Sequence, residues 1–409
     1  MALPFLPSEQ SDVEWRSRAA SVIPGGASTG SKRPDALFGP GTDFGPTHFV
    51  RASGCRVTTA AGAEIIDCTM ALGAVALGYA DEAVTHAVVE AASQGNVSGL
   101  SHVLEVEVAE RLCEVVPCAE QVRFLKSGAE GVAAAVRIAR THTGRSLVLG
   151  AGYFGWLDWW SDAPGVPPGA HADFHAVPFD DVAALETAVR ANGDALAAIV
   201  IEPVIERFPS EAWVAAARRL CDEHGAVLIF DEMKTGFRVR TGGYQEYAGI
   251  TPDLAVFGKA LANGYPLSAI VGKEDVMRAA ASTWISSTLA GESTALAAAA
   301  AVLERHARRE VCEALWETGA EMQRAVERAI EAAGVSGVRV RGIPPMWFID
   351  FDDDRWRTRF LETALEHGVL FKRGAYNFAS LAHDEDAIAA IETAATEALV
   401  RVRDELGAR

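Results

Sequence analysis

An acid and a lysine, each at the end of an apolar run, are the residues best suited to do chemistry. Asp231 lies in FDEMKTGFR, and Lys259 follows it by 28 residues in LAVFGKALANGYPLSAIVG. Burial disfavours the charged form of lysine, which lowers its pKa and makes the neutral, nucleophilic amine accessible. Taken singly, Lys259 could instead extend to solvent, and Asp231 could cap a helix or bind magnesium. Further motifs are therefore needed to decide between these alternatives.

A third motif, KSGAEG at residues 126–131, lies where an apolar run meets a helical pattern. Ser127 can cap the helix, and Gly128 lets a ligand approach the backbone closely. The unpaired amides at such a helix start form an anion site suited to one phosphate. The alternative is an ordinary turn between a strand and a helix, because the segment is neither a Walker loop nor GxGxxG.

The middle of the chain must position these motifs, and there short apolar runs alternate with helical patterns. This alternation predicts an α/β fold with a mainly parallel sheet covered on both faces. Continuous apolar runs such as AAIVI and AVLIF fit strands that are buried on both sides. Strands are expected at 121–126, 146–150, 196–204, 226–232, 254–259 and 268–273, and helices at 131–141, 212–224 and 295–303.

The two ends of the chain have a different texture. Residues 1–60 are rich in Gly and Pro and predict an irregular arm that joins a smaller domain, whereas 61–305 form the large domain. Residues 306–409 predict the rest of a smaller α+β unit, with long helices flanking short strands. These helices are expected at 311–333 and 387–406, and the strands at 338–341, 346–351 and 369–372.

Composition disfavours several classes of partner. The chain has 409 residues, and 37 basic against 55 acidic residues give a net charge of −18, which disfavours nucleic acid. Six cysteines without a CxxC pair indicate reduced thiols. The start lacks the pattern of a signal peptide, and no apolar run approaches the ~18 residues of a membrane span. We therefore expect a cytoplasmic protein without a membrane partner.

Two acid or histidine clusters could suggest a metal, but neither predicts one. His171 and His175 lie in a loop rich in Pro and Gly, and no HExxH motif occurs. The acidic run Asp350–Asp354 is better explained as a solvated turn in which Asp354 caps the following helix. We expect no metal site.

The order and spacing of the three chemical motifs resemble the class III aminotransferases, and within them the branch of the glutamate-1-semialdehyde aminomutases. The resemblance extends over nearly the whole chain, through PGGAS, AGAEIIDCTMALGAVALGYA, GYFGWLDWW, IVIEPVI and SSTLAGESTALAAA. It implies the fold type I of the pyridoxal-phosphate enzymes, in which a large domain holds a mostly parallel, seven-stranded sheet and a smaller α+β domain accompanies it. Pyridoxal 5′-phosphate is the cofactor that it implies.

The resemblance also implies roles for the motif residues. Lys259 matches the lysine that forms a Schiff base with the cofactor and then moves the proton as base and acid. Asp231 matches the aspartate that keeps the pyridine nitrogen protonated. Ser127, Gly128 and Ala129 match the turn that binds the phosphate, although the family usually has Thr where Ala129 stands.

Other positions match residues around the cofactor ring. Tyr153 matches the aromatic residue stacked on one face, and Met233 the apolar residue on the other, while Phe154 replaces a usual histidine. Glu202 matches a glutamate near the cofactor, with a purely structural role as the alternative. Thr288 matches a threonine that reaches the phosphate of the neighbouring subunit, which implies a homodimer.

Substrate contacts are less defined in the sequence. Arg33 is the candidate to meet a substrate carboxylate, with Lys372 and Arg373 as alternatives. Trp156 could form an apolar pocket wall, although core packing is the ordinary role of Trp156, Trp159 and Trp160.

The resemblance implies an aminotransferase that moves an amino group between an amino donor and an aldehyde or ketone. The aminomutase is the alternative, since it shares every cofactor residue. Bulkier residues after the lysine, in ALANGYPLSA, and the pair Glu292 and Ser293 where Asn and Pro are common, favour the aminotransferase. A homologue that binds the cofactor without turnover is disfavoured, because both Lys259 and Asp231 are present.

Overall fold

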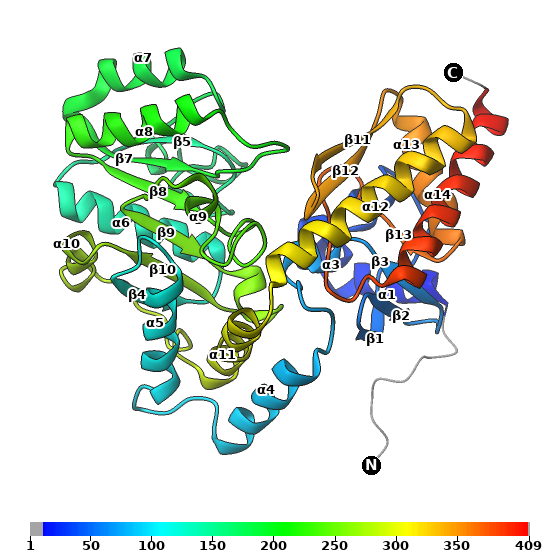
Figure 1. Ribbon diagram of the computed structural model, residues 1–409, viewed down its shortest axis with the longest axis horizontal. Helices are drawn as coiled ribbons and strands as arrows, with labels where there is room; N and C mark the ends of the chain where they lie inside the picture. The colour runs from blue at the N-terminus through cyan, green and yellow to red at the C-terminus, as the bar shows by residue number, and fades with distance from the viewer. Residues whose placement is uncertain (1–10, 408–409) are drawn as a thin grey trace. The chain divides into compact units, whose positions relative to one another are not determined.

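A computed structural model describes residues 11–407, which form two compact units (Figure 1). One unit comprises residues 82–312, and the other combines the chain up to residue 81 with the chain from residue 313 onward. The boundaries expected from the sequence were 60/61 and 305/306. No described helix is long and apolar enough to cross a membrane. The prediction about a signal peptide concerns the first residues, of which 1–10 lie outside the described part.

A seven-stranded sheet forms the centre of the unit of residues 82–312, and this confirms the predicted fold class. Strand β10 is antiparallel to both of its neighbours, and the other pairs are parallel. Strand β6 was not predicted, since its three residues FHA form no apolar run. The spatial order is β4 (Gln121–Leu125), β10 (Ser268–Gly272), β9 (Leu254–Phe257), β8 (Val227–Asp231), β7 (Leu196–Ile201), β5 (Leu147–Ala151) and β6 (Phe174–Ala176).

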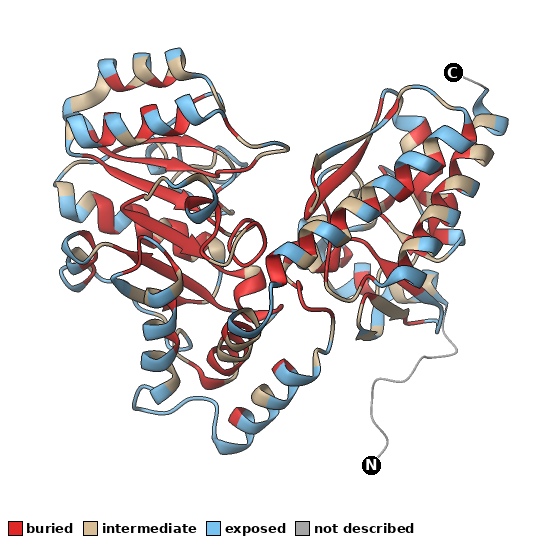
Figure 2. Ribbon diagram, in the orientation of Figure 1, coloured by how far each residue is buried: buried red, intermediate tan, exposed pale blue. Residues whose placement is uncertain are grey.

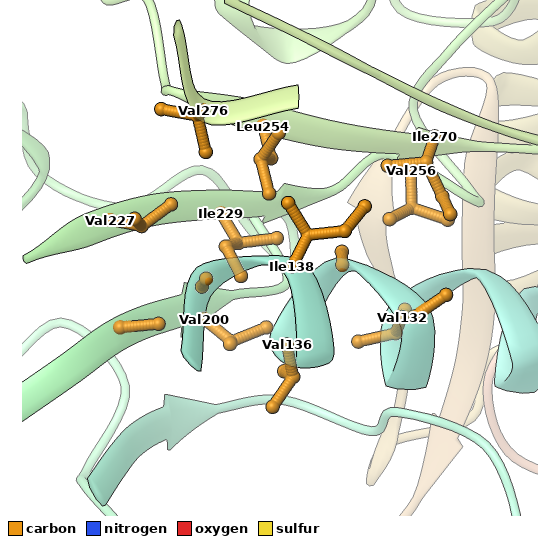
Figure 3. Packing of buried hydrophobic residues seen from close by; sticks show 14 of the residues in the cluster. Val132, Val136, Ile138, Val200, Val227, Ile229, Leu254, Val256, Ile270 and Val276 are labelled. Carbon is orange, nitrogen blue, oxygen red and sulfur yellow. The ribbon is translucent and has the colours of Figure 1, made fainter. Parts of the chain in front are cut away.

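Apolar packing fixes the helices on this sheet. Side chains of α6 (Gly128–Thr143), such as Val132 and Ile138, pack against residues of the central strands, such as Ile229 and Val256 (Figure 3). Burying each such side chain stabilises the fold by about 1.5–3 kcal/mol. The central strands are buried along their whole length (Figure 2). The other main helices are α4 (Glu82–Gln94), α5 (Val103–Val115), α7 (Val182–Asn192), α8 (Glu211–His224) and α11 (Ser293–Arg308).

The second unit contains two small sheets and the long C-terminal helices. One sheet has the order β1 (Phe49–Ser53), β2 (Arg56–Thr59), β3 (Glu64–Asp67) and β13 (Val369–Leu370). The other has the order β11 (Val338–Ile343), β12 (Met346–Phe351) and β14 (Asn377–Phe378). The helices are α1 (Asp12–Val22), α12 (Val311–Ala333), α13 (Asp354–Glu366) and α14 (Glu385–Leu406).

The expectation of an irregular arm is wrong for residues 11–60, because α1, β1 and β2 lie there. The strands are short and half exposed, so they lack the apolar runs that identify a buried strand. Their sheet is completed by β13, which pairs in parallel with β3 across about 300 residues of chain, and a local pattern cannot reveal such a partner.

The acidic run 350–354 is structural. Asp350 pairs with Arg339 at 2.8 Å, and the side chain of Asp353, not Asp354, caps α13 by accepting from the Arg355 N–H at 2.9 Å. The predicted cap was therefore wrong by one residue. Among residues 11–407, no group of His, Cys, Asp and Glu could hold a metal ion.

Candidate active site

The turn between β4 and α6 is closed by a capping box. Glu130 accepts hydrogen bonds from the Ser127 N–H at 2.8 Å and the Ser127 hydroxyl at 2.9 Å, and Ser127 Oγ accepts from the Glu130 N–H. The first N–H groups of a helix lack intrahelical partners. Because the capping box pairs the N–H groups of Ser127 and Glu130, the N–H groups of Gly128 and Ala129 between them are available to bind an anion. Glu130 was not among the residues predicted from the sequence, although the S-x-x-E spacing signals a capping box.

Met233 brings this turn to the segment that precedes Lys259. A Cβ atom at Gly128 would lie 2.8 Å from Met233 Cε, and one at Gly258 would lie 2.5 Å from the same atom. The Met233 side chain therefore lies close against the backbone of both glycines. The predicted phosphate turn, Met233 and the start of the lysine segment thus lie together.

Asp231 and Lys259 lie at the same edge of the sheet. Asp231 ends β8 and pairs in register with Val256 of β9, the strand that runs parallel to β8 and ends shortly before Lys259. Asp231 is buried, and its Oδ1 accepts from the Met233 N–H at 3.0 Å. Lys259 has a left-handed backbone with a φ of 48°, a conformation that is strained for a residue with a side chain.

Burial shifts both groups toward their neutral forms. The pKa of Asp231 is raised, first by burial and then by the negative charge of Glu202. The pKa of Lys259 is lowered, first by burial and then by the positive charge of Lys234. A lysine with a lowered pKa offers a larger fraction of neutral amine at a given pH, which is the nucleophilic form.

Glu202 follows β7 and joins the same edge. Its Oε1 lies 2.6 Å from Lys234 Nζ, and its Oε2 accepts from the Tyr153 N–H at 3.2 Å. A Cβ atom at Gly152 would lie 2.4 Å from the Glu202 Cβ, so the two segments touch. The sequence analysis did not single out Lys234. Its only signal was a lysine inside the strand-end motif FDEMKTGFR.

The aromatic segment after β5 divides into packed and exposed rings. Trp160 donates to the Gly155 carbonyl at 3.0 Å and meets Tyr153 edge to face at 5.5 Å between ring centroids. Trp159 packs against the buried core, as the sequence analysis expected for the tryptophans by default. Tyr153 and Trp156 remain 64% and 74% exposed, so both rings can meet a ligand.

Thr288 lies apart from these residues. It is exposed in a groove of about 650 Å³ that is lined by residues 95–103, 122–125, 285–288 and 290–291, and by none of the other predicted site residues. Nearby, Lys126 Nζ lies 2.8 Å from Glu292 Oε1, and Glu292 caps α11. Glu292, one of the positions at which the sequence departs from the family pattern, is therefore held by an ion pair with Lys126.

The predicted substrate cations lie in the other unit. Arg33 is exposed and lies against Gly25. Arg373 pairs with Asp354 and donates to Thr358 at 2.9 Å, so its charge is used within the unit. Lys372 is half-buried and lines an apolar cavity of about 430 Å³.

The residues of the edge fit pyridoxal phosphate. Unpaired amides at the start of α6 suit a single phosphate, the buried Asp231 suits a cationic ring nitrogen, and the Lys259 amine suits an aldehyde. Met233 lies against the backbone of Gly128 and Gly258, between the phosphate turn and the lysine segment.

The chain belongs to the class III aminotransferase family. The family profile, described as "Aminotransferase class-III", matches residues 40–150 and 169–383. The chain is therefore a pyridoxal-phosphate-dependent transaminase of fold type I, and the predicted family, activity and cofactor are confirmed.

Individual relatives agree with this assignment. The chain is 31% identical over 400 residues to the 3-aminobutyryl-CoA aminotransferase of Cloacimonas acidaminovorans, covering 94% of this chain and 95% of the relative. It is 32% identical over 421 residues to the glutamate-1-semialdehyde 2,1-aminomutase of Polynucleobacter necessarius, covering 92% and 96%. The solved FumI protein of Sphingopyxis sp. MTA144, in its PLP internal aldimine form, matches with a TM-score of 0.91 and 28% identity over 97% of both chains.

Proposed function

We propose that this transaminase moves an amino group between two separate molecules, an amino donor and an aldehyde or ketone, with Lys259 as its reactive amine. The observation that carries the proposal is the meeting of Asp231 and Lys259 at one sheet edge, beside the turn that Met233 links to it. Pyridoxal phosphate, when bound, supplies an electron sink for the carbon that loses a proton.

Each residue of the edge has a part in this proposal. Lys259 would hold pyridoxal phosphate covalently, its neutral amine joining the aldehyde with loss of water, and once the amino donor had displaced it, the freed amine would serve as base and acid for the proton. The Asp231 carboxylate holds the proton of the ring nitrogen. Gly128 and Ala129 donate their amides to the phosphate, with Ser127 shaping the turn.

The remaining residues orient the ring. Met233 and the exposed Tyr153 would hold the ring between them, and Glu202 fixes the backbone of Tyr153 through the hydrogen bond at 3.2 Å. Trp156 is 74% exposed and is proposed as an apolar wall for substrate. Arg33 is proposed to meet a substrate carboxylate.

We further propose a homodimer in which Thr288 serves the site of the partner subunit. Its exposure in a groove without the other site residues supports this role. Large apolar side chains near the groove are exposed, and such patches mark interfaces: Leu100 (84%), Val103 (69%), Trp284 (83%) and Leu289 (49%). None of the six cysteines, all within the described residues, forms a disulfide, which supports a reducing, cytoplasmic location, and the net charge of −18 disfavours nucleic acid.

The aminomutase remains the second candidate, because an aminomutase is among the relatives. The pair Glu292 and Ser293 supports transamination, since Asn and Pro are common at these positions in the mutase branch, and Glu292 is held here by an ion pair with Lys126. The test is to mix the pyridoxal form with an amino donor alone and to separate small molecules from protein. A transaminase releases a keto product and leaves the pyridoxamine form. Rapid conversion of glutamate-1-semialdehyde to 5-aminolevulinate without a second substrate would overturn the proposal.

A further inference from the structure

A second lysine at the reactive edge forms a buried ion pair. Lys234 Nζ lies 2.6 Å from Glu202 Oε1, and the two side chains are only 12% and 11% exposed. The other Glu202 oxygen accepts from the Tyr153 N–H. Glu202 is therefore held by two partners, the ammonium of Lys234 and the backbone N–H of Tyr153.

This ion pair lies beside Lys259, because Glu202, Asp231 and Lys259 stand at or just after the C-terminal ends of the adjacent parallel strands β7, β8 and β9. Asp231 and Glu202 carry negative charges that favour the ammonium form of Lys259, whereas Lys234 and Arg238 carry positive charges that oppose it. Lys234 and Lys259 in turn favour the ionised form of Asp231, and Glu202 opposes it. Removing one of these charges leaves the others uncompensated.

We propose that Lys234 is a positioning residue that keeps Lys259 in its neutral, reactive form through the buried ion pair with Glu202. The inference deepens the proposed function and rests on it, since it concerns the amine that reacts there. It assigns a role to a residue of the strand-end motif that the general reaction does not need.

The charge of Lys234 acts on Lys259 in two ways, and both have the same sign. It repels a second cation directly, and it neutralises Glu202, which would otherwise stabilise the Lys259 ammonium. Both effects are strong in a buried site, where charges are poorly screened. Stability does not explain such a pair, because replacing a buried ion pair by apolar residues is often neutral or stabilising.

The experiment uses the full-length protein loaded with pyridoxal phosphate and follows the absorbance of the bound cofactor against pH. In Lys234→Met, the pKa of the absorbance transition is expected to rise by about 1 pH unit or more. In Glu202→Gln the shift has the opposite sign, because the positive charge of Lys234 is then uncompensated. Lys234→Arg keeps the charge and stays close to the unmodified protein.

Lys273→Met is the matched control. It breaks an ion pair of similar length, 2.7 Å from Nζ to Asp253 Oδ1, at the opposite end of β9. The absorbance transition of this variant is expected to be unchanged. A shift equal to that of Lys234→Met would show a general effect of lost charge and would overturn the proposal.

A second measurement covers variants that bind cofactor poorly. In protein freed of cofactor, acetylation of Lys259 by an amine-reactive ester is followed against pH by mass spectrometry. Lys234→Met is expected to require a higher pH for half-maximal labelling, and Glu202→Gln a lower one. An unchanged pH dependence in both variants would overturn the role of Lys234. If the unmodified protein itself showed no absorbance from covalently bound cofactor, the proposed function would be wrong, and this result is distinct from one that contradicts only the role of Lys234.

Discussion

The two edges of the seven-stranded sheet use the same kinds of charged side chain in different ways. Where β9 begins, the Asp253 carboxylate accepts from Lys273 at 2.7 Å, Arg218 at 2.9 Å and the Leu228 N–H at 2.8 Å. Where β8 and β9 end, Asp231 accepts from the Met233 N–H at 3.0 Å, and burial acts against its charge and that of Lys259.

The difference separates a structural site from a reactive one. Both oxygens of Asp253 have cationic partners from α8 and from the end of β10, so that edge is satisfied within the chain. At the other edge, groups with shifted pKa values gather beside a helix start, which is typical of sites that bind and react. The presence of carboxylates and cations alone therefore does not identify a reactive site. A reactive site is identified by charged groups whose charge the fold leaves only partly neutralised.

The largest expected effect is that of Lys259→Ala. Turnover and the absorbance of covalently bound cofactor are expected to disappear, because no other amine stands at the end of β9, whereas pyridoxal phosphate can still bind noncovalently. Absorbance and a donor assay measure the two effects. Near-normal activity would show that another group carries the chemistry.

Asp231→Asn is expected to leave cofactor bound and to slow the chemical step. The amide keeps the shape of the carboxylate but cannot hold the ring nitrogen protonated. The cost of an uncompensated buried charge is about 3 kcal/mol or more, which corresponds to a loss of about 10²-fold. Single-turnover reaction with an amino donor measures it, and an unchanged rate would refute the assignment.

At the opposite edge, Asp253→Asn should affect stability and spare the spectrum. The change removes the charged partner of Lys273 and one of the two carboxylate partners of Arg218, which keeps Asp222, and this costs about 1.5–3 kcal/mol. Chemical denaturation measures the free energy of unfolding, and the absorbance of bound cofactor serves as the control. If the absorbance transition moved as well, the contrast between the two edges would be lost.

Most of the reactive edge was predictable from sequence, because its residues lie at the ends of apolar runs in which local patterns indicate buried strands. Asp231, Lys259 and the turn at Ser127 were found in this way. The ion-pair partner of Glu202, Lys234, was not found, since Glu202 follows β7 and Lys234 lies in the turn after β8, and the two meet only when these strands lie side by side in the sheet.

The fold shows the same limit. The long apolar strands β7 and β8 were predicted, whereas β6 and the strands β1 and β2 were missed. These short strands are partly exposed and depend on distant partners, such as β13 for the sheet that contains β1 to β3. The cap of α13 was missed by one residue, because a run of acids offers several equivalent caps.

Thr288→Ala should weaken retention of the cofactor without changing the fold. It removes one hydrogen bond to a charged acceptor, worth about 1.5–3 kcal/mol. Dialysis followed by absorbance measures retention, and light scattering tests the dimer on which the prediction depends. An active monomer at working concentration would contradict it.

The smallest effect is expected for Glu292→Gln, which removes the charge that pairs with Lys126 and caps α11. The loss of stability should be about 1 kcal/mol. Glu321→Gln, which breaks an exposed pair with Arg324, is the control and should leave Tm unchanged. Equal shifts in Tm for the two variants would remove any special role of the Glu292 pair.

The most direct test of the reactive edge is to reduce the protein with borohydride after loading it with pyridoxal phosphate and to locate the adduct by peptide mass spectrometry. The account predicts one stable pyridoxyl group per chain, on Lys259. An adduct on Lys234, Lys126 or another lysine, with Lys259 unmodified, would contradict it.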